Sequence, residues 1–258
     1  MDSLCRAGAA TGWVAMGRGV WSGGDAPEGV LGVLGGMGTL ASAAFLRTLY
    51  EENPTATEQD APRCILHSDP GFPDRSQAIL SGDPAGIPER LARHLELLQH
   101  AGATRIVMGC VTLHHFLPQV PEALRRPVIS LVDLIVDAVA RAGEAHLMIC
   151  TLGTRRSRIF ERHPRWSEIE TLMRFPSQDE QKAVHEMLYR AKAKPVGESD
   201  LMLLDELRTR YDVDTLIAGC TEMHLVHGVL RRRPEPAPYE IEDPLFRIAQ
   251  DLPAFLTD

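Results

Sequence analysis

The sequence predicts an α/β protein made of two similar Rossmann-like lobes with parallel sheets. Two observations carry this prediction. Short apolar runs of strand length alternate with longer segments of helical periodicity, which is the pattern of parallel strands connected by helices. The same strand end also occurs twice, because RIVMGC in the first half of the chain is matched by TLIAGC in the second half.

Six apolar runs have the length and composition of buried parallel strands. They are VLGVL (30–34), RCILH (63–67), TRIVM (104–108), RPVIS (126–130), AHLMIC (145–150) and DTLIAG (214–219). Helical periodicity is found at 40–52, 88–100, 131–141, 178–192 and 199–210. In the second of these segments Leu91, Leu95 and Leu98 share one face, and Gly102 lies where a C-cap is expected.

The internal repeat defines the expected domains. Strand ends with a glycine and a polar residue recur at offsets of about 115 and 110 residues: Gly38-Thr39 and Gly109-Cys110, then Gly153-Thr154 and Gly219-Cys220. We therefore predict lobe 1 over 29–130 and lobe 2 over 131–235, with 236–258 returning to lobe 1. A pseudo-twofold relation would place equivalent strand ends on facing walls of one cleft, where open α/β sheets bind ligands.

Charge and hydropathy narrow the possible partners. The net charge of −8 disfavours nucleic acid or an anionic membrane, because both bind a basic face. No run of 18 or more apolar residues predicts a transmembrane helix. Residues 1–28 lack the pattern of a secretory signal and are expected to form a flexible N-terminal tail. A cytoplasmic location with reduced thiols follows.

The residue types also argue against a cofactor. The five cysteines are odd in number and form no C-x-x-C pair, so neither a metal site nor a disulfide framework is expected. Lysine is scarce, which leaves few candidates for the Schiff base of pyridoxal phosphate chemistry: Lys182, Lys192 and Lys194. The turn GVLGGMGT fits neither G-x-G-x-x-G nor G-x-x-x-x-G-K-[ST], so it does not predict a nucleotide site.

Cys110 and Cys220 end equivalent predicted strands. Taken singly, each would be interpreted as a core residue, because free cysteine is among the most buried residue types. Taken as a pair on facing lobes, they allow a thiolate to remove a proton from one face of a carbon while a thiol delivers one to the other face. Inverting a stereocentre next to a carboxylate requires this arrangement. The pairing therefore favours an acid–base role.

Five segments, in order, resemble the aspartate/glutamate racemase superfamily and, within it, its aspartate racemase-like branch. They are LGVLGGMGTLASAAFL, EQDAPRCILHSDPGFPDRSQAI, GATRIVMGCVTLHHF, LMICTLGTRRS and IAGCTEMHLV. The third and fifth resemble the family motifs Cys-Asn-Thr-x-His and Gly-Cys-Thr-Glu. The resemblance spans about 29–229. It implies a cofactor-independent enzyme that uses two cysteines as acid and base across a cleft, binds a small carboxylate-bearing substrate and forms a homodimer.

The resemblance also implies roles for individual residues. Cys110 and Cys220 would be the catalytic pair, and Arg75 would bind a substrate carboxylate, which suits its planar guanidinium. The remaining implied substrate contacts are Met37, Thr39, Thr112, Thr151, Thr154, Thr221 and Glu222. Other interpretations stay open at this point: Arg75 as an exposed partner of Asp74, Thr39 as a helix cap, and Glu222 as a residue that only hydrogen-bonds within its lobe.

Two positions depart from the family pattern. Val111 stands where the family has asparagine, and Ala61 stands where it has histidine. Valine cannot form a hydrogen bond, and an unpaired polar group in a closed site costs about 1–3 kcal/mol. We therefore expect a less polar cleft and a changed substrate or reaction. Three functions remain open: an amino-acid racemase or epimerase, an isomerase or decarboxylase of a non-amino-acid (di)carboxylate, and a catalytically silent racemase-like protein.

Overall fold

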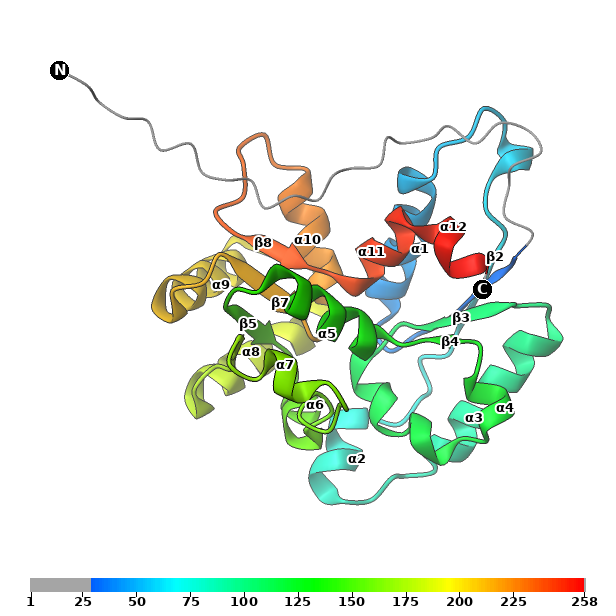
Figure 1. Cartoon of the computed structure of the whole chain (residues 1–258), viewed down its shortest axis with the longest axis horizontal. Helices are drawn as coiled ribbons and strands as arrows, with labels where there is room; N and C mark the ends of the chain where they lie inside the picture. Colours follow the sequence, from blue (N-terminus) through cyan, green and yellow to red (C-terminus); the bar gives the residue numbers. More distant parts are fainter. Residues whose placement is uncertain (1–28, 258) are drawn as a thin grey trace.

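The computed structural model describes residues 29–257, and it contains two four-stranded parallel sheets. Their strand orders are β2-β1-β3-β4 and β6-β5-β7-β8, so both sheets place the second strand outside the first and the fourth outside the third. In Figure 1 the first sheet (β2, β3 and β4 are labelled) lies on the right, and the second (β5, β7 and β8) lies on the left. This topology confirms two similar parallel α/β lobes. The tail predicted at 1–28 lies outside the described residues.

All six predicted strands are present, and two short strands were not predicted. The first sheet contains β1 (Leu31–Gly35), β2 (Cys64–Ser68), β3 (Arg105–Met108) and β4 (Val128–Ile129). The second contains β5 (His146–Ile149), β6 (Met173–Arg174), β7 (Thr215–Ala218) and β8 (Glu240–Glu242). Strands β6 and β8 span two and three residues, too few to produce a readable pattern. Strand β1 is buried at every position, which explains its continuous apolar run.

The five long helices agree with the predicted segments. They are α1 (Thr39–Glu52), α3 (Ile87–His100), α5 (Leu131–Ala142), α8 (Gln178–Ala191) and α9 (Glu198–Tyr211). The shorter helices escaped prediction because periodicity needs a window of about 11–18 residues. They are α2 (Arg75–Ser81), α4 (Glu122–Arg125), α6 (Leu152–Ser157), α7 (Trp166–Ile169), α10 (Met223–Arg231), α11 (Pro244–Gln250) and α12 (Leu252–Leu256). Three 3-10 helices are η1 (Glu58–Asp60), η2 (Val111–His115) and η3 (Leu117–Gln119).

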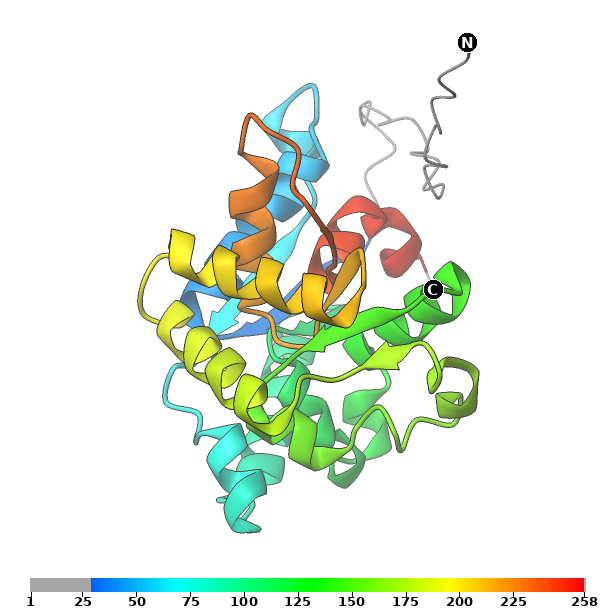
Figure 2. The same cartoon turned by 90° about the vertical axis from the view of Figure 1, so that its left-hand side faces the viewer.

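The apolar core has three layers. An outer layer packs α3 against the first sheet, and another packs α8 and α9 against the second. Figure 2 shows α8 and α9 side by side on the outer side of the second lobe. The central layer joins the lobes, since it combines residues of β1 and β7 with residues of α5, α11 and α12. Within residues 29–257 no helix is long and apolar enough to cross a membrane.

The C-terminal segment contributes to both lobes. Strand β8 pairs in parallel with β7, so residues 240–242 belong to the second sheet. Helix α11 then packs against α1 of the first lobe. The return of 236–258 to lobe 1 stays a prediction. The residue numbers of the lobe boundaries stay a prediction.

A buried polar chain links α1 to α10 and α11. The Thr48 hydroxyl lies 3.0 Å from His224 Nε2, and His224 Nδ1 lies 2.6 Å from the Asp243 carboxylate. Burial opposes ionisation of Asp243, but His224 and His227 hold the pKa of this carboxyl below its ordinary value. The chain thus keeps an ionised carboxylate at the N-terminus of α11, where the helix dipole favours it.

Candidate active site

The two predicted cysteines lie at equivalent strand ends, and the structure brings these ends together. Strand β3 is followed by Gly109 and Cys110, and strand β7 is followed by Gly219 and Cys220. The Thr221 hydroxyl donates a hydrogen bond to the Gly109 carbonyl at 3.0 Å, which joins the two ends across the lobes. Each cysteine is 6% exposed, so both residues are buried where the strand ends meet.

A carboxylate stands beside the second thiol. The Cys220 thiol donates a hydrogen bond to Glu222 Oε2 at 2.8 Å. Glu222 is 1% exposed, and its Oε1 has no hydrogen-bond partner among the described residues. A Cβ atom on Gly38 would lie 2.6 Å from this oxygen, so a larger residue there would displace the Glu222 carboxylate. Burial raises the pKa of Cys220 well above its ordinary value, and the Glu222 carboxylate raises it further. Cys220 is therefore a protonated thiol at neutral pH.

A cation stands beside the first thiol. Arg75 is 7% exposed, and its Nη groups donate to the carbonyls of Met37 at 3.1 Å and Pro73 at 3.0 Å. Its Nε has no hydrogen-bond partner among the described residues. Burial opposes the charge, yet the neighbouring Cys110 and Asp74 raise the pKa of Arg75 above its ordinary value. Arg75 is thus a buried cation and not an exposed loop residue.

The loop that carries Arg75 is fixed by the glycine turn and by α3. The Asp69 carboxylate lies 2.6 Å from Arg90 and 2.8 Å from His94. Gly36 has a φ of 94°, and a Cβ atom there would lie 2.4 Å from the Asp69 backbone. The turn after β1 and the loop after β2 therefore pack backbone to backbone, which only glycine permits.

Four buried hydroxyls form a cluster between the lobes. The Thr112 hydroxyl lies 2.7 Å from that of Thr154, which lies 3.1 Å from that of Thr151. The Ser76 hydroxyl donates to Thr151 at 3.2 Å. A Cβ atom on Gly153 would lie 2.5 Å from Ser76, so glycine permits the close contact of α2 and α6. Three of the predicted threonines thus meet in space, and Ser76 joins them without having been predicted.

The other predicted contacts are placed differently. Thr39 is exposed at the start of α1, and the N-cap is Gly38, so Thr39 does not cap the helix. Met37 is 3% exposed and contributes its carbonyl to Arg75. Val111 is 1% exposed and packs within the central core. Substrate contact by these three residues stays a prediction.

Lys192 is a further cation that sequence reasoning did not assign to the site. A Cβ atom on Gly38 would lie 3.6 Å from Lys192 Cγ, and Lys192 Nζ lies 3.9 Å from the centre of the Tyr189 ring. Its charge acts on Asp74 and Cys220, and it favours the ionised form of both. The sequence shows that lysine is scarce, but it did not indicate that the charge of Lys192 acts on Cys220.

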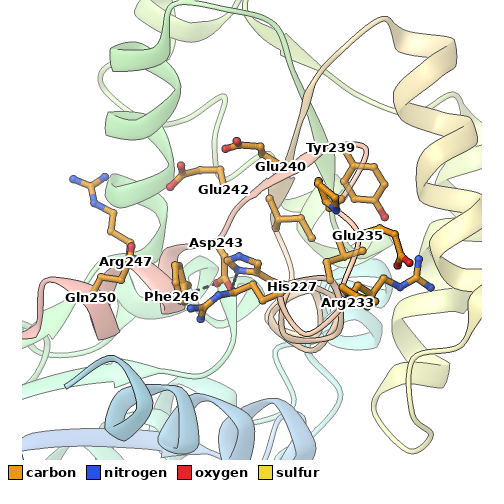
Figure 3. Close-up of a pocket in the computed structure, with 16 residues that line it drawn as sticks. His227, Arg233, Glu235, Tyr239, Glu240, Glu242, Asp243, Phe246, Arg247 and Gln250 are labelled. Atoms are coloured by element: carbon orange, nitrogen blue, oxygen red, sulfur yellow. Dashed lines mark hydrogen bonds and ion pairs between the residues drawn. The ribbon is translucent and has the colours of Figure 1, made fainter. Parts of the chain in front are cut away.

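A separate cavity of about 590 Å³ lies between α10, β8 and α11 (Figure 3). Several charges on its walls are already paired: His227 lies 3.1 Å from Asp243, Arg231 lies 2.7 Å from Glu52, and Arg233 pairs with Glu198. None of the predicted site residues lines it. Across residues 29–257 no group of three or more histidines, cysteines or carboxylates is arranged to hold a metal ion.

The structure thus has two parallel α/β lobes whose Gly-Cys strand ends meet where the lobes pack together. The family model described as Asp/Glu/Hydantoin racemase matches residues 34–239, and the chain belongs to this family. The match covers both Gly-Cys strand ends.

Solved racemase structures share the fold. Aspartate racemase from Picrophilus torridus is 20% identical, with a TM-score of 0.71 over 88% of this chain and 94% of that one. An aspartate racemase homologue from Pyrococcus horikoshii is 17% identical, with a TM-score of 0.57 over 87% and 98%. Glutamate racemase from Campylobacter jejuni is 18% identical, with a TM-score of 0.58 over 86% and 84%. At these identities the likeness concerns the fold.

Replacing Glu222 with glutamine should lower the pKa of Cys220, because the change removes the carboxylate charge next to the thiol. A fall of one pKa unit raises the thiolate fraction about tenfold at a pH below the pKa. We expect Cys220 alkylation by iodoacetamide, followed by mass spectrometry, to begin at lower pH and to run about tenfold faster at pH 8. Cys64, whose pKa burial raises to about 11, provides an internal reference. An unchanged Cys220 rate would contradict the assigned role of Glu222.

Proposed function

We propose that this protein is a cofactor-independent amino-acid racemase or epimerase in which Cys110 and Cys220 act as base and acid on opposite faces of the substrate. The observation that supports it best is the opposite charge beside each thiol. The Arg75 guanidinium lies beside Cys110, and the Glu222 carboxylate accepts a hydrogen bond from the Cys220 thiol at 2.8 Å. The guanidinium can stabilise negative charge that develops on Cys110, and the carboxylate holds the thiol proton of Cys220.

The unpaired polar atoms support a zwitterionic substrate. Buried polar atoms without a partner are uncommon in folded proteins and call for an explanation. Arg75 Nε is an unpaired donor, and Glu222 Oε1 is an unpaired acceptor. A substrate carboxylate would accept from the first, and a substrate ammonium would donate to the second. Lys192 adds a cation suited to a second carboxylate, which favours an acidic amino acid.

The proposed reaction needs no net change in protons. The Cys110 thiolate removes the α-proton, and Arg75 stabilises the negative charge that develops next to the carboxylate. The Cys220 thiol then delivers its proton to the opposite face of the α-carbon. The enzyme is left with Cys110 protonated and Cys220 ionised. The opposite enantiomer reacts in the reverse sense and restores the first state.

Proton exchange with solvent tests this function directly. Wild-type protein in D₂O should introduce deuterium at the α-carbon of its substrate, which proton NMR detects as loss of the α-signal. Chiral chromatography should show the second enantiomer appearing at the same time. The panel should include aspartate, glutamate and neutral amino acids. Absence of exchange with the whole panel would contradict an amino-acid racemase.

A second candidate is a related reaction on a molecule without an amino-acid head, such as isomerisation or decarboxylation of a (di)carboxylate. Val111 favours it, because this residue follows the first thiol and packs in an apolar core without any hydrogen-bonding group. The description of the family includes hydantoins as well as amino acids. The scaffold is therefore not restricted to free amino acids.

The variant Val111→Asn distinguishes the two candidates. For an amino-acid racemase we expect racemisation to rise, because the new amide offers a hydrogen bond to the substrate. Loss of native turnover without any gain in racemisation would favour the second candidate instead. Val111→Thr is the matched control for burying a polar group of similar size. Melting temperatures of both variants separate a change in reaction from a loss of folding.

A further inference from the structure

A second cavity, of about 280 Å³, is lined in part by the segment that follows Cys110. Residues of both lobes form its walls. The first lobe contributes residues of η2, η3 and α4, and the N-terminus of α5 adds Val132 and Asp133. The second lobe contributes residues of the segment 159–164. None of the proposed acid–base or carboxylate-binding residues lines this cavity.

The cavity is basic in a protein that is acidic overall. Arg125 and Arg162 line it from different lobes, and neither guanidinium group makes a hydrogen bond or an ion pair with another described residue. Burial lowers the pKa of His115, and the charge of Arg162 lowers it further, so Arg162 lies close to this ring. The carboxylate on the wall, Asp133, lies 3.0 Å from His163 Nε2. Two exposed arginines and one carboxylate thus line this cavity, and its charged walls carry an excess of positive charge.

The remaining walls suit a small anion with an apolar body. Leu117, Pro118 and Ile159 provide apolar surface. Helix α5 is 12 residues long and begins at Leu131, next to the cavity. The N-terminus of a helix carries a partial positive charge that favours anions. The helix dipole therefore favours an anion at this wall, where Asp133 of the first turn already lies.

We propose that this cavity binds a small dianion, a dicarboxylate or a phosphate group, held between Arg125 of the first lobe and Arg162 of the second. Arginine pairs with the oxygens of both groups through parallel N–H donors. Bound there, the anion would neutralise the two guanidinium groups and connect α4 to the segment 159–164. This site goes beyond the proposed function, because it lies outside the space between the thiols.

His114 connects the cavity to the first thiol. Its Nε2 lies 3.1 Å from the backbone N–H of Leu131, so Nε2 is the acceptor and Nδ1 carries the proton. Nδ1 then donates to the carbonyls of Cys110 at 3.3 Å and Val111 at 3.2 Å. Because His114 also lines the cavity, an anion there would act on the backbone that positions Cys110.

Calorimetric titration with succinate and, separately, with inorganic phosphate tests the site at constant ionic strength. The protein for this test carries Arg75→Gln, which removes the carboxylate-binding residue proposed between the thiols. We expect binding of succinate, phosphate or both, and about tenfold weaker binding after Arg125→Gln or Arg162→Gln in the same background. Arg126→Gln is the matched control, because Arg126 neighbours Arg125 but does not line the cavity.

Several outcomes would overturn the proposal. It fails if neither anion binds the Arg75→Gln protein, because any binding to wild type would then belong to the space between the thiols. It also fails if affinity is unchanged after Arg125→Gln and Arg162→Gln, or falls equally with Arg126→Gln. Two separate single variants guard against misfolding of one. Racemase activity is not needed for the readout, so failure of the proposed function would leave this test intact.

Discussion

Alanine at Cys110 or Cys220 should greatly reduce inversion and leave hydrogen exchange on one face of the substrate. In Cys220→Ala the remaining Cys110 can still remove the α-proton from one enantiomer and return solvent deuterium to the same face. Inversion should fall by about 10²–10⁴, the range for loss of a positioned acid or base. Cys110→Ala should show the mirror-image preference. Proton NMR in D₂O with each pure enantiomer, followed by chiral chromatography, separates exchange from inversion.

Cys150 offers a matched control. It is buried in the central core, where burial raises the pKa of its thiol to about 12. Cys150→Ala should therefore retain inversion, with only the stability loss of a small core truncation. The two-thiol mechanism would be contradicted if either Cys110→Ala or Cys220→Ala inverted its substrate at the wild-type rate. An equal loss in Cys150→Ala would point to a general effect of core substitution.

The second large effect is expected for Arg75→Gln. The change removes a buried cation and its hydrogen bonds to the substrate carboxylate. A hydrogen bond to a charged group contributes about 1.5–3 kcal/mol, so loss of this contact should lower kcat/KM roughly 100-fold. Steady-state kinetics should show a lower kcat and a higher KM, because Arg75 would both stabilise the developing charge and bind the carboxylate.

Two further variants serve as controls for this prediction. Arg75→Lys keeps the charge but not the planar fork, so it should recover only part of kcat/KM. Arg93→Gln changes an exposed arginine of α3 away from the thiols and should leave the kinetics unchanged. Wild-type kinetics in Arg75→Gln, with an unaltered melting temperature, would remove Arg75 from the site.

The predicted elements succeeded where the pattern was local. Strands β1, β3 and β7 are short apolar runs because packing covers both of their faces. Helix α3 shows its apolar face directly in the spacing of Leu91, Leu95 and Leu98. Strands β6 and β8 lack such a signal, since they are held by pairing with β5 and β7 and not by their own composition.

In the candidate site, too, some residues could be predicted from the sequence and others could not. Both Gly-Cys strand ends were visible in the sequence because each is a short local motif that occurs once in each half. The groups around the thiols were harder to predict from the sequence. Ser76 and Lys192 were not predicted, and the hydrogen bond between Cys220 and Glu222 has no sequence signature. Residues such as Gly38 and Glu222 meet only when the first turn of one lobe packs against the second strand end of the other.

By itself, the sequence determined the two-lobed parallel α/β class, the equivalence of the two strand ends and the two candidate thiols. The tertiary structure alone decided that Arg75 lies beside Cys110, that Glu222 accepts a hydrogen bond from Cys220, and that Val111 packs in the central core. The physical reason is the range of the interactions. Periodicity reports which face of a segment is buried, whereas the Thr221–Gly109 contact joins residues 112 positions apart and depends on how whole lobes pack.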